Sequence, residues 1–193
     1  YDARWFASAD GSEPEYVDLG PLGEVPFGID LIVSRGALKI GVEICEDLWM
    51  PIPPSSYQAL AGANLILNLS ASNELIGKAQ WRQTLVNSQS GRCLAAYAYA
   101  GAGPGESTTD IVFGGHCLIA ENGQVLAESN RVGDSHDQAV KSTSATADID
   151  LQRLAHDRRK TTSWQIASQR LTVSFRTVEL NQSNASSDGS LRS

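Results

Sequence analysis

Short apolar runs alternate with polar stretches along the first half of the chain. The runs Leu38–Ile44, Asn64–Leu69 and Cys93–Ala100 are apolar and have the length of strands. Between the last two, Lys78–Ser90 carries apolar residues on one side at helical spacing, which predicts a helix of about three and a half turns. Gly91 then suits the left-handed position at which many helices end.

The second half of the chain contains a hairpin signal. Phe113–Ala120 and Gln124–Glu128 have strand-like patterns, and Asn122–Gly123 between them favours a tight turn with positive φ angles. Farther on, Ala145–Ile149 predicts a strand, and Asp150 begins a helix with an aspartate cap. Strands that alternate with helices and then give way to a hairpin predict an α/β fold built in layers.

Polar, proline-rich or glycine-rich segments separate these elements. They predict loops over residues 1–16, 51–56, 101–110 and 132–144. A short helix is expected over Tyr57–Ala61, with Ser55 or Ser56 as its cap. The serine-rich end, residues 181–193, predicts a disordered tail after one domain that spans residues 1–180.

Composition narrows the class of protein. The chain has 193 residues, a net charge of −7 and a pI near 4.9, which argues against a nucleic-acid-binding surface. No apolar run reaches the roughly 18 residues that a membrane span requires. The three cysteines are widely spaced, which predicts neither a disulfide framework nor a metal site and suits a reducing cytoplasm.

Cys45 is the strongest chemical signal in the chain. It ends the predicted strand Leu38–Ile44 and is followed by two carboxylates and a tryptophan. A strand that stops at a cysteine exposes the sulfur on a tight turn while the sheet holds it still, which is how enzymes place nucleophiles. A buried structural cysteine is the alternative. Core packing is the interpretation that we favour for Cys93 and Cys117, which lie in apolar runs.

Several stretches resemble one family, and they occur in the same order. The run Gly41–Trp49 (Gly-Val-Glu-Ile-Cys-Glu-Asp-Leu-Trp) is similar to the nucleophile segment of the nitrilase, or carbon-nitrogen hydrolase, superfamily. Its Cys-Glu-Asp-Leu-Trp version resembles the glutaminase domains of glutamine-dependent NAD synthetases. Further matches lie in Ala63–Asn73, Arg92–Tyr99, Gly105–Asp110 and Val112–Leu126. Together they cover residues 20 to 160, approximately.

This resemblance implies a fold and a reaction. The fold would be the C-terminal part of a nitrilase-like four-layer α-β-β-α sandwich. The reaction would be hydrolysis of the glutamine side-chain amide through a thioester on Cys45, with the backbone N–H of Glu46 as an oxyanion donor. The Glu46 carboxylate would bind the α-ammonium of glutamine, and Trp49, Ser72 and Lys78 would complete the substrate pocket.

Each of these residues also has an ordinary structural interpretation. Glu46 can belong to a solvated turn, and Trp49 can be a core aromatic. Ser72 suits a helix cap as well as a substrate contact. Lys78 and Arg82, both weaker candidates for binding the substrate carboxylate, can be solvated cations on a helix surface.

The resemblance is incomplete in two respects. The family uses a general-base glutamate and an oxyanion lysine that precede the nucleophile, yet no residue before Cys45 matches either motif. Lys39 is the sole lysine there, and it lies inside the nucleophile strand. The family's synthetase domain, with its phosphate loop, is also missing, since Gly101–Gly105 lacks the strand–loop–helix context of such a loop. We therefore expect this chain alone to be inactive and to hold no cofactor, with ATP and Mg²⁺ bound by the absent domain.

The full-length enzyme implied by the resemblance would pass ammonia from glutamine to nicotinate adenine dinucleotide and would form a homo-oligomer. Two alternatives stay open: a stand-alone carbon-nitrogen hydrolase, and a truncated, inactive product. Glu46–Trp49 and Gly105–Asp110 favour the synthetase branch. A partial sandwich would also leave the strands Leu38–Ile44 and Leu65–Leu69 with uncovered apolar faces.

Overall fold

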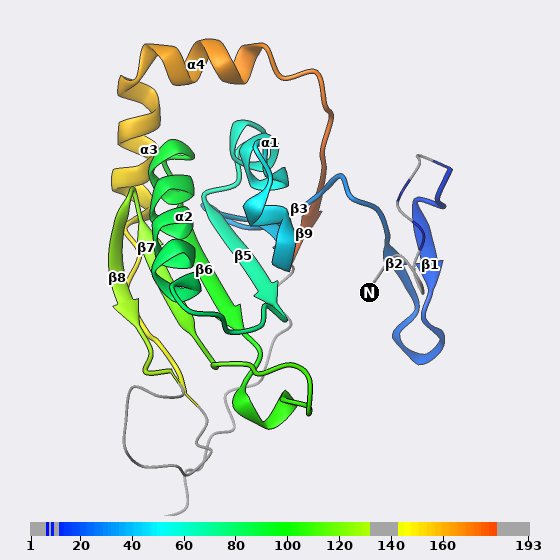
Figure 1. Ribbon diagram of the computed structural model, residues 1–193. Helices are drawn as coiled ribbons and strands as arrows, with labels where there is room; N and C mark the ends of the chain where they lie inside the picture. The colour runs from blue at the N-terminus through cyan, green and yellow to red at the C-terminus, as the bar shows by residue number, and fades with distance from the viewer. Residues whose placement is uncertain (1–6, 8, 10–11, 132–142, 181–193) are drawn as a thin grey trace, which may run out of the picture.

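One mixed sheet of seven strands organises the computed structural model, which describes residues 7, 9, 12–131 and 143–180 (Figure 1). The strands lie in the order β8-β7-β6-β5-β4-β3-β9. Their bounds are β3 Leu31–Arg35, β4 Leu38–Ile44, β5 Leu65–Ser70, β6 Ala96–Gly101, β7 Cys117–Glu121, β8 Gln124–Glu128 and β9 Arg176–Glu179. The central strands β4, β5 and β6 run parallel, and antiparallel pairs flank them on both sides. The predicted α/β class is confirmed.

Two helices cover one face of this sheet. They are α1 (Pro54–Leu60), which connects β4 to β5, and α2 (Lys78–Arg92), which connects β5 to β6 (Figure 1). Parallel neighbours require such crossover connections, because a tight turn cannot bring the chain back to the same edge of the sheet.

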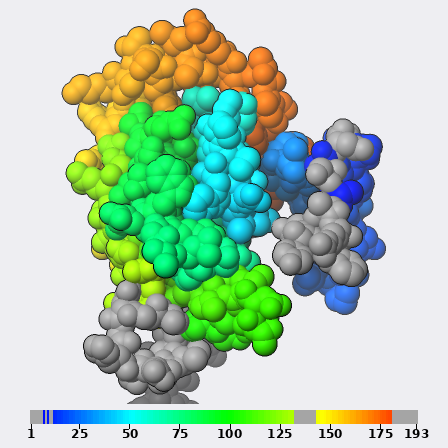
Figure 2. Space-filling view, viewed as in Figure 1, coloured from blue at the N-terminus to red at the C-terminus, as the bar shows by residue number. Residues whose placement is uncertain are grey.

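The remaining elements lie at the margins of the sheet. Two helices, α3 (Leu151–Lys160) and α4 (Thr162–Gln169), follow β8 in the chain, and α4 lies next to α1. The strands β1 (Tyr16–Asp18) and β2 (Glu24–Pro26), joined through the 3-10 helix η2 (Gly20–Leu22), form a small antiparallel sheet that stands beside the main body (Figure 2).

The face of the sheet beneath α1 and α2 holds the core. Ile66, Tyr97 and Leu118 are fully buried there and belong to the main hydrophobic cluster. Gly41 is required on this face, because a β-carbon at that position would overlap the side chain of Gln58 in α1. Much of the main hydrophobic cluster therefore lies on this side of the sheet.

The opposite face of β4 and β5 is apolar and largely open. Ile44 is 62% exposed, Leu69 59% and Val42 41%. The register pairs Ile44 with Leu69 and Val42 with Leu67, next to the pair formed by Ile40 and Leu65, so these side chains form one contiguous patch. Patches of this kind mark surfaces that another element covers. The expectation of uncovered apolar faces on these two strands is confirmed.

Several element predictions are confirmed as well. Leu38–Ile44 is β4, and the helix predicted from Lys78 begins at that residue. The hairpin turn lies at Asn122–Gly123, with φ angles of +48° and +86°. Helix α3 begins after Asp150, whose carboxylate accepts a 2.9 Å hydrogen bond from the N–H of Arg153.

Helix α2 ends later than predicted. Gly91 lies inside the helix, where a β-carbon would lie 3.2 Å from Cα of Gly123 in the hairpin turn. Leu94 takes the left-handed conformation instead, with φ +44°. Strand β6 therefore starts at Ala96 and not at Cys93. The close approach of two backbones, and not a helix stop, is what requires glycine at position 91.

The short helix and one predicted strand also differ from expectation. Helix α1 starts at Pro54 with Pro53 in the cap position, so Ser55 and Ser56 lie inside the helix. Proline suits the first helical turn because its missing N–H would have no partner there. Ala145–Ile149 is not a strand, since it joins neither sheet.

The sequence pattern does not predict β3 or β9, and it starts β7 too early. β7 begins at Cys117 and not at Phe113, after a turn in which Gly115 has φ +69°. β9 carries few apolar residues and joins the sheet beside β3, where Arg176 donates two hydrogen bonds, of 2.7 and 2.8 Å, to the Asp30 carboxylate. A long-range ion pair of this kind leaves no local pattern.

Some predictions fall outside the described part of the chain. Residues 132–142 and 181–193 are outside it, and so are residues 1–6, 8, 10 and 11. The predicted loop over 132–144, the predicted tail, and most of the loop predicted over residues 1–16 therefore stay predictions. The last residue of that first loop belongs to β1.

We expect the isolated chain to self-associate through the open face of β4 and β5, because contiguous exposed apolar side chains bury one another in water. Combining Val42→Glu with Leu69→Lys should lower the particle mass measured by light scattering toward that of the monomer. Gln80→Lys, on the exposed side of α2, is the control and should leave the mass unchanged. A monodisperse monomer of the unsubstituted chain, with protected amides in both strands, would contradict this expectation.

Candidate active site

Cys45 lies on a sharp turn at the end of β4. The 3-10 helix η3 (Cys45–Trp49) begins there, and Cys45 takes the left-handed conformation with φ +50°. A non-glycine residue loses about 1–2 kcal/mol in that region, so the surroundings must hold it. The Asp47 carboxylate contributes, because it accepts a 2.8 Å hydrogen bond from the Ile44 N–H and closes the turn. The thiol is half-buried, unlike a structural core cysteine.

An ammonium group and an aromatic ring lie beside this turn. Lys78 is the first residue of α2, and its Nζ lies 5.4 Å from the centre of the Trp49 ring. The same Nζ donates a 2.7 Å hydrogen bond to Oδ1 of Asn73. Lys78 is thus held in place and is not a freely solvated helix cation.

The charge of Lys78 interacts with the predicted nucleophile. Burial lowers the pKa of the Lys78 ammonium, and the nearby Arg82 lowers it further. The Cys45 thiolate, Glu74 and Glu46 offset part of this lowering. The fold therefore brings Cys45, Glu46 and Lys78 within electrostatic reach of one another, although they come from two elements that are far apart in sequence.

Ser72 lies at the same edge of the sheet, just after β5. Its helix-cap alternative is wrong, because Gly77 occupies the cap position of α2. Tyr99 of β6 is also buried, and burial raises the pKa of its hydroxyl; Cys45 adds to this rise, whereas Ser70, Arg82 and Ser72 offset part of it. Sequence analysis missed Tyr99, and the alternating Ala-Tyr pattern of β6 is the signal that both tyrosines share the face beneath the helices.

Glu43 precedes Cys45 by two residues but is committed to the core. It is 2% exposed, and its carboxylate accepts hydrogen bonds from the Ser55 N–H, at 2.8 Å, and from the Tyr97 hydroxyl. Nδ2 of Asn68 donates to the same hydroxyl at 3.1 Å. This network joins α1, β5 and β6 to β4 behind the nucleophile. Because these hydrogen bonds occupy the Glu43 carboxylate, Glu43 has a structural role, which agrees with the absence of a general-base motif around it.

Lys39 and Arg82, the two other basic residues named above, differ in position and burial. Lys39 lies near the start of β4, with its Nζ 3.6 Å from the position of a β-carbon on Gly62, and therefore far from the thiol end of the strand. Arg82 is 1% exposed, and Glu74 and His116 engage its guanidinium. Only Nη1 is engaged in this way, whereas Nε and Nη2 of the same guanidinium are buried and have no hydrogen-bond partner within the described residues.

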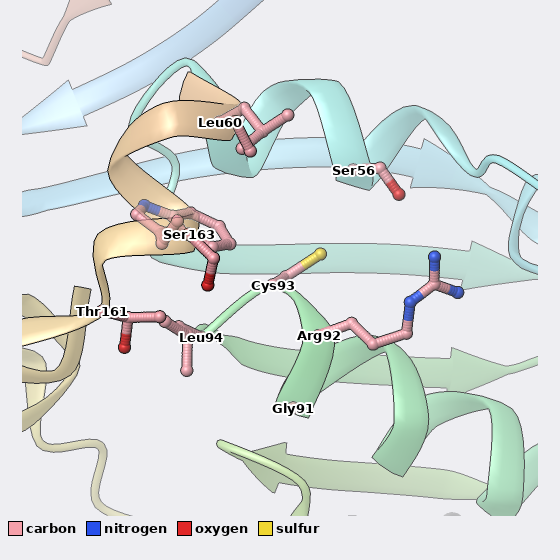
Figure 3. A pocket seen from close by; sticks show the side chains of 10 residues that line it. Ser56, Leu60, Gly91, Arg92, Cys93, Leu94, Thr161 and Ser163 are labelled. Carbon is pink, nitrogen blue, oxygen red and sulfur yellow. The ribbon is translucent and has the colours of Figure 1, made fainter. Parts of the chain in front are cut away.

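A cavity of about 360 Å³ lies elsewhere, between α1, α4 and the end of α2 (Figure 3). Cys93 lines it together with Ser56 and Trp164, but none of the predicted site residues does. Cys93 is 3% exposed, and burial raises the pKa of its thiol to about 12, which makes it a poor nucleophile. Core packing is confirmed for Cys93, whereas Cys117 is half-buried at the start of β7.

The glycine-rich loop after β6 has no phosphate-loop architecture. Gly101 ends the strand, and a 3-10 helix of three residues, η4 (Pro104–Glu106), follows. Among the described residues, no three His, Cys, Asp or Glu side chains are grouped so that they could hold a metal ion. No helix in the same part of the chain is long and apolar enough to cross a membrane.

A cysteine on a strained turn at the carboxyl edge of parallel strands, with a lysine beside it, is typical of hydrolases that use a thiol nucleophile. Residues 7–159 match the carbon-nitrogen hydrolase family. The chain belongs to this family, as the sequence motifs predict.

The similarity extends to particular proteins. The glutamine-dependent NAD(+) synthetase of Mycobacterium tuberculosis is 41% identical over 185 residues, which are 93% of this chain and 26% of that protein. The crystal structure of a glutamine-dependent NAD(+) synthetase from Cytophaga hutchinsonii matches with a TM-score of 0.57 and 30% identity, over 77% of this chain and 23% of that one. Saccharomyces cerevisiae Nit3, of the nitrilase superfamily, shares the fold, with a TM-score of 0.56 and 19% identity over 72% of this chain and 47% of its own. The chain thus spans about a quarter of the synthetases that it matches.

The left-handed conformation of Cys45 predicts an unusual order of stabilities. Cys45→Gly should be more stable than Cys45→Ala by about 1 kcal/mol, because glycine adopts positive φ without the steric cost that alanine keeps. Urea unfolding followed by circular dichroism measures the difference. The same pair at Cys117, inside a strand, should show the reverse order. Equal stabilities of the two Cys45 variants would mean that the turn is not strained.

Proposed function

We propose that this chain is the glutamine-hydrolysing part of a glutamine-dependent NAD synthetase. The observation that carries the proposal is the position of Cys45, on a strained turn within electrostatic reach of Lys78 and Glu46, in a carbon-nitrogen hydrolase chain. The names of the M. tuberculosis and C. hutchinsonii relatives favour this reaction over that of a stand-alone amidase or nitrilase.

Cys45 is the nucleophile of the proposed reaction. Its thiolate attacks the side-chain amide carbon of glutamine, and the amide oxygen takes up the negative charge. The backbone N–H of Glu46 donates a hydrogen bond to that oxygen. The C–N bond then breaks, the nitrogen accepts a proton and leaves as ammonia, and a thioester remains on Cys45. Water attacks the thioester carbon, which releases glutamate and restores the thiol.

Opposite charges orient the amino-acid end of glutamine in this proposal. The exposed Glu46 carboxylate pairs with the α-ammonium, and the Lys78 ammonium pairs with the α-carboxylate. The Trp49 ring packs against the aliphatic part of the glutamine side chain. The Lys78 Nζ lies over this ring, so the ring and the ammonium are on the same side of the turn. Ser72, at the end of β5, adds a hydroxyl to the pocket. Burial of Lys78 strengthens its pairing because the charge is less screened by water.

The general base and the lysine oxyanion donor come from outside the described residues in this proposal. Glu43 is occupied by Tyr97 and Ser55, and Lys39 lies at the other end of β4. ATP and Mg²⁺ belong to a synthetase domain, because the loop after β6 does not offer the helix N-terminus that binds phosphate. Nicotinate adenine dinucleotide, homo-oligomer formation and a cytoplasmic location likewise belong to the complete enzyme.

The isolated chain should not hydrolyse glutamine at a measurable rate. Loss of a general base lowers rates by about 10²–10⁴, and loss of an oxyanion donor by about 10²–10³. Ammonia release from glutamine, followed with a coupled assay, measures this. The complete protein that carries this segment is the positive control. Release by the 193-residue chain at a rate near that of the complete protein would contradict the assignment.

A glutamine-like electrophile, a diazo-ketone amino acid, should label Cys45 in the complete protein. Cys93 should stay unlabelled because its thiol is buried and its pKa is raised. Cys117 should also stay unlabelled because it begins β7 and does not lie on the turn that begins η3. Peptide mass spectrometry locates the label, and excess glutamine should slow its attachment. Labelling confined to Cys93 or Cys117 would overturn the assignment of the nucleophile.

A further inference from the structure

A chain of polar side chains crosses the protein beneath the candidate site. Nη1 of Arg82 lies 2.9 Å from Oε1 of Glu74 and 2.9 Å from Nδ1 of His116. Nε2 of His116 lies 2.8 Å from Oε1 of Glu128, and Nε2 of Gln83 donates to the other oxygen of Glu128 at 3.0 Å. Arg82 and His116 are each 1% exposed. The chain therefore joins a surface carboxylate on β8 to the loop between β5 and α2.

The direction of these hydrogen bonds follows from chemistry. A guanidinium nitrogen can only donate, so Nδ1 of His116 accepts, and Nε2 carries the proton and donates to Glu128. Burial lowers the pKa of His116, against the opposing effect of Glu128, and so favours the neutral ring that this direction requires. The two hydrogens on Nη1 of Arg82 serve Glu74 and His116, one each. Nη1 of Arg82 therefore sets the distance between Glu74, in the loop between β5 and α2, and the buried His116.

The loop tied in this way carries predicted substrate groups. Residues 71–77 include Ser72 and lead directly into Lys78. Leu75, Ile76 and Gly77 are exposed, so packing does little to hold the loop. Glu74 is its anchor: its backbone N–H donates a 2.8 Å hydrogen bond to the Val112 carbonyl.

The Glu74 side chain also fits tightly against the neighbouring segment. A β-carbon on Gly114 would lie 2.7 Å from Oε1 of Glu74 and 2.8 Å from its Cγ. Glycine at position 114 is therefore required for the carboxylate to reach Arg82. Glu74 thus makes three separate contacts, which hold the loop in place: with the Val112 backbone, with Gly114 and with the Arg82 guanidinium.

We propose that Glu74 and Arg82 are positioning residues for glutamine: they hold the loop over residues 71–77 so that Ser72 and Lys78 face the substrate. The inference rests on the proposed glutamine hydrolysis. The carboxylate and guanidinium act through the loop and touch neither the substrate nor the thiol. Their loss should therefore weaken glutamine binding and leave the chemistry at Cys45 nearly intact.

Steady-state kinetics of glutamine hydrolysis by the complete protein test this inference. Glu74→Gln and Gly114→Ala should each raise KM for glutamine roughly tenfold, since each weakens one charge-assisted hydrogen bond. The value of kcat should change less than about twofold, since the thiol and its oxyanion donor are untouched. Glu24→Gln removes the same charge from an exposed position in β2 and should change neither constant. Arg82→Gln should not add to the effect of Glu74→Gln, because both act on one interaction.

A purely structural role predicts a different result: a smaller active fraction, with lower kcat and unchanged KM, and this result would overturn the inference. Hydrogen exchange gives a second reading that needs no turnover. The Glu74 amide should exchange faster in Glu74→Gln and in Gly114→Ala than in the unsubstituted protein. If the unsubstituted protein releases no ammonia, the proposed function fails. The exchange rate of the Glu74 amide then decides by itself whether Glu74 and Arg82 hold the loop over residues 71–77. Unchanged exchange in both variants would show that it is not.

Discussion

The parallel register of β4, β5 and β6 is the constraint on which the candidate site depends. Ile44 pairs with Leu69, and Leu69 pairs with Ala100, so the three strands end at one level. Whatever follows each strand must therefore meet at the same edge, as it does at the carboxyl edge of other open α/β sheets. Cys45 follows β4 there, and Ser72 follows β5. The crossover helices α1 and α2 make this register possible, and α2 supplies Lys78 from its first turn.

The two faces of the sheet have opposite roles. The face beneath α1 and α2 holds buried polar groups as well as apolar ones, and in the Glu43–Tyr97–Asn68 network the Glu43 carboxylate and the Tyr97 hydroxyl are hydrogen-bonded to each other, to Ser55 and to Nδ2 of Asn68. Such a network specifies how the strands and helices meet, because an unpaired member would cost more than an apolar pair. The other face is apolar and exposed, so it contributes little stability until a partner surface covers it.

Local strain and polar anchoring work together around the thiol. Cys45 holds a conformation that an isolated chain would avoid, and the Asp47 carboxylate and the ends of β4 and η3 impose it. The loop after β5 is held in a similar way, since Glu74 binds Arg82 and not a hydrophobic neighbour. Both segments are thus fixed by directional hydrogen bonds, which set position more sharply than apolar packing does.

The sequence by itself determined the elements whose signals are local. β4, the start of α2, the Asn122–Gly123 turn and the Asp150 cap were predictable, because pleat alternation, helical period, turn chemistry and capping each involve neighbouring residues. The Cys-Glu-Asp-Leu-Trp motif also indicated the family. Only the tertiary structure decided the rest. The place of β9, the burial of Arg82 and Tyr99 and the role of Gly91 arise from contacts between distant segments, and such contacts leave no periodic trace in the chain.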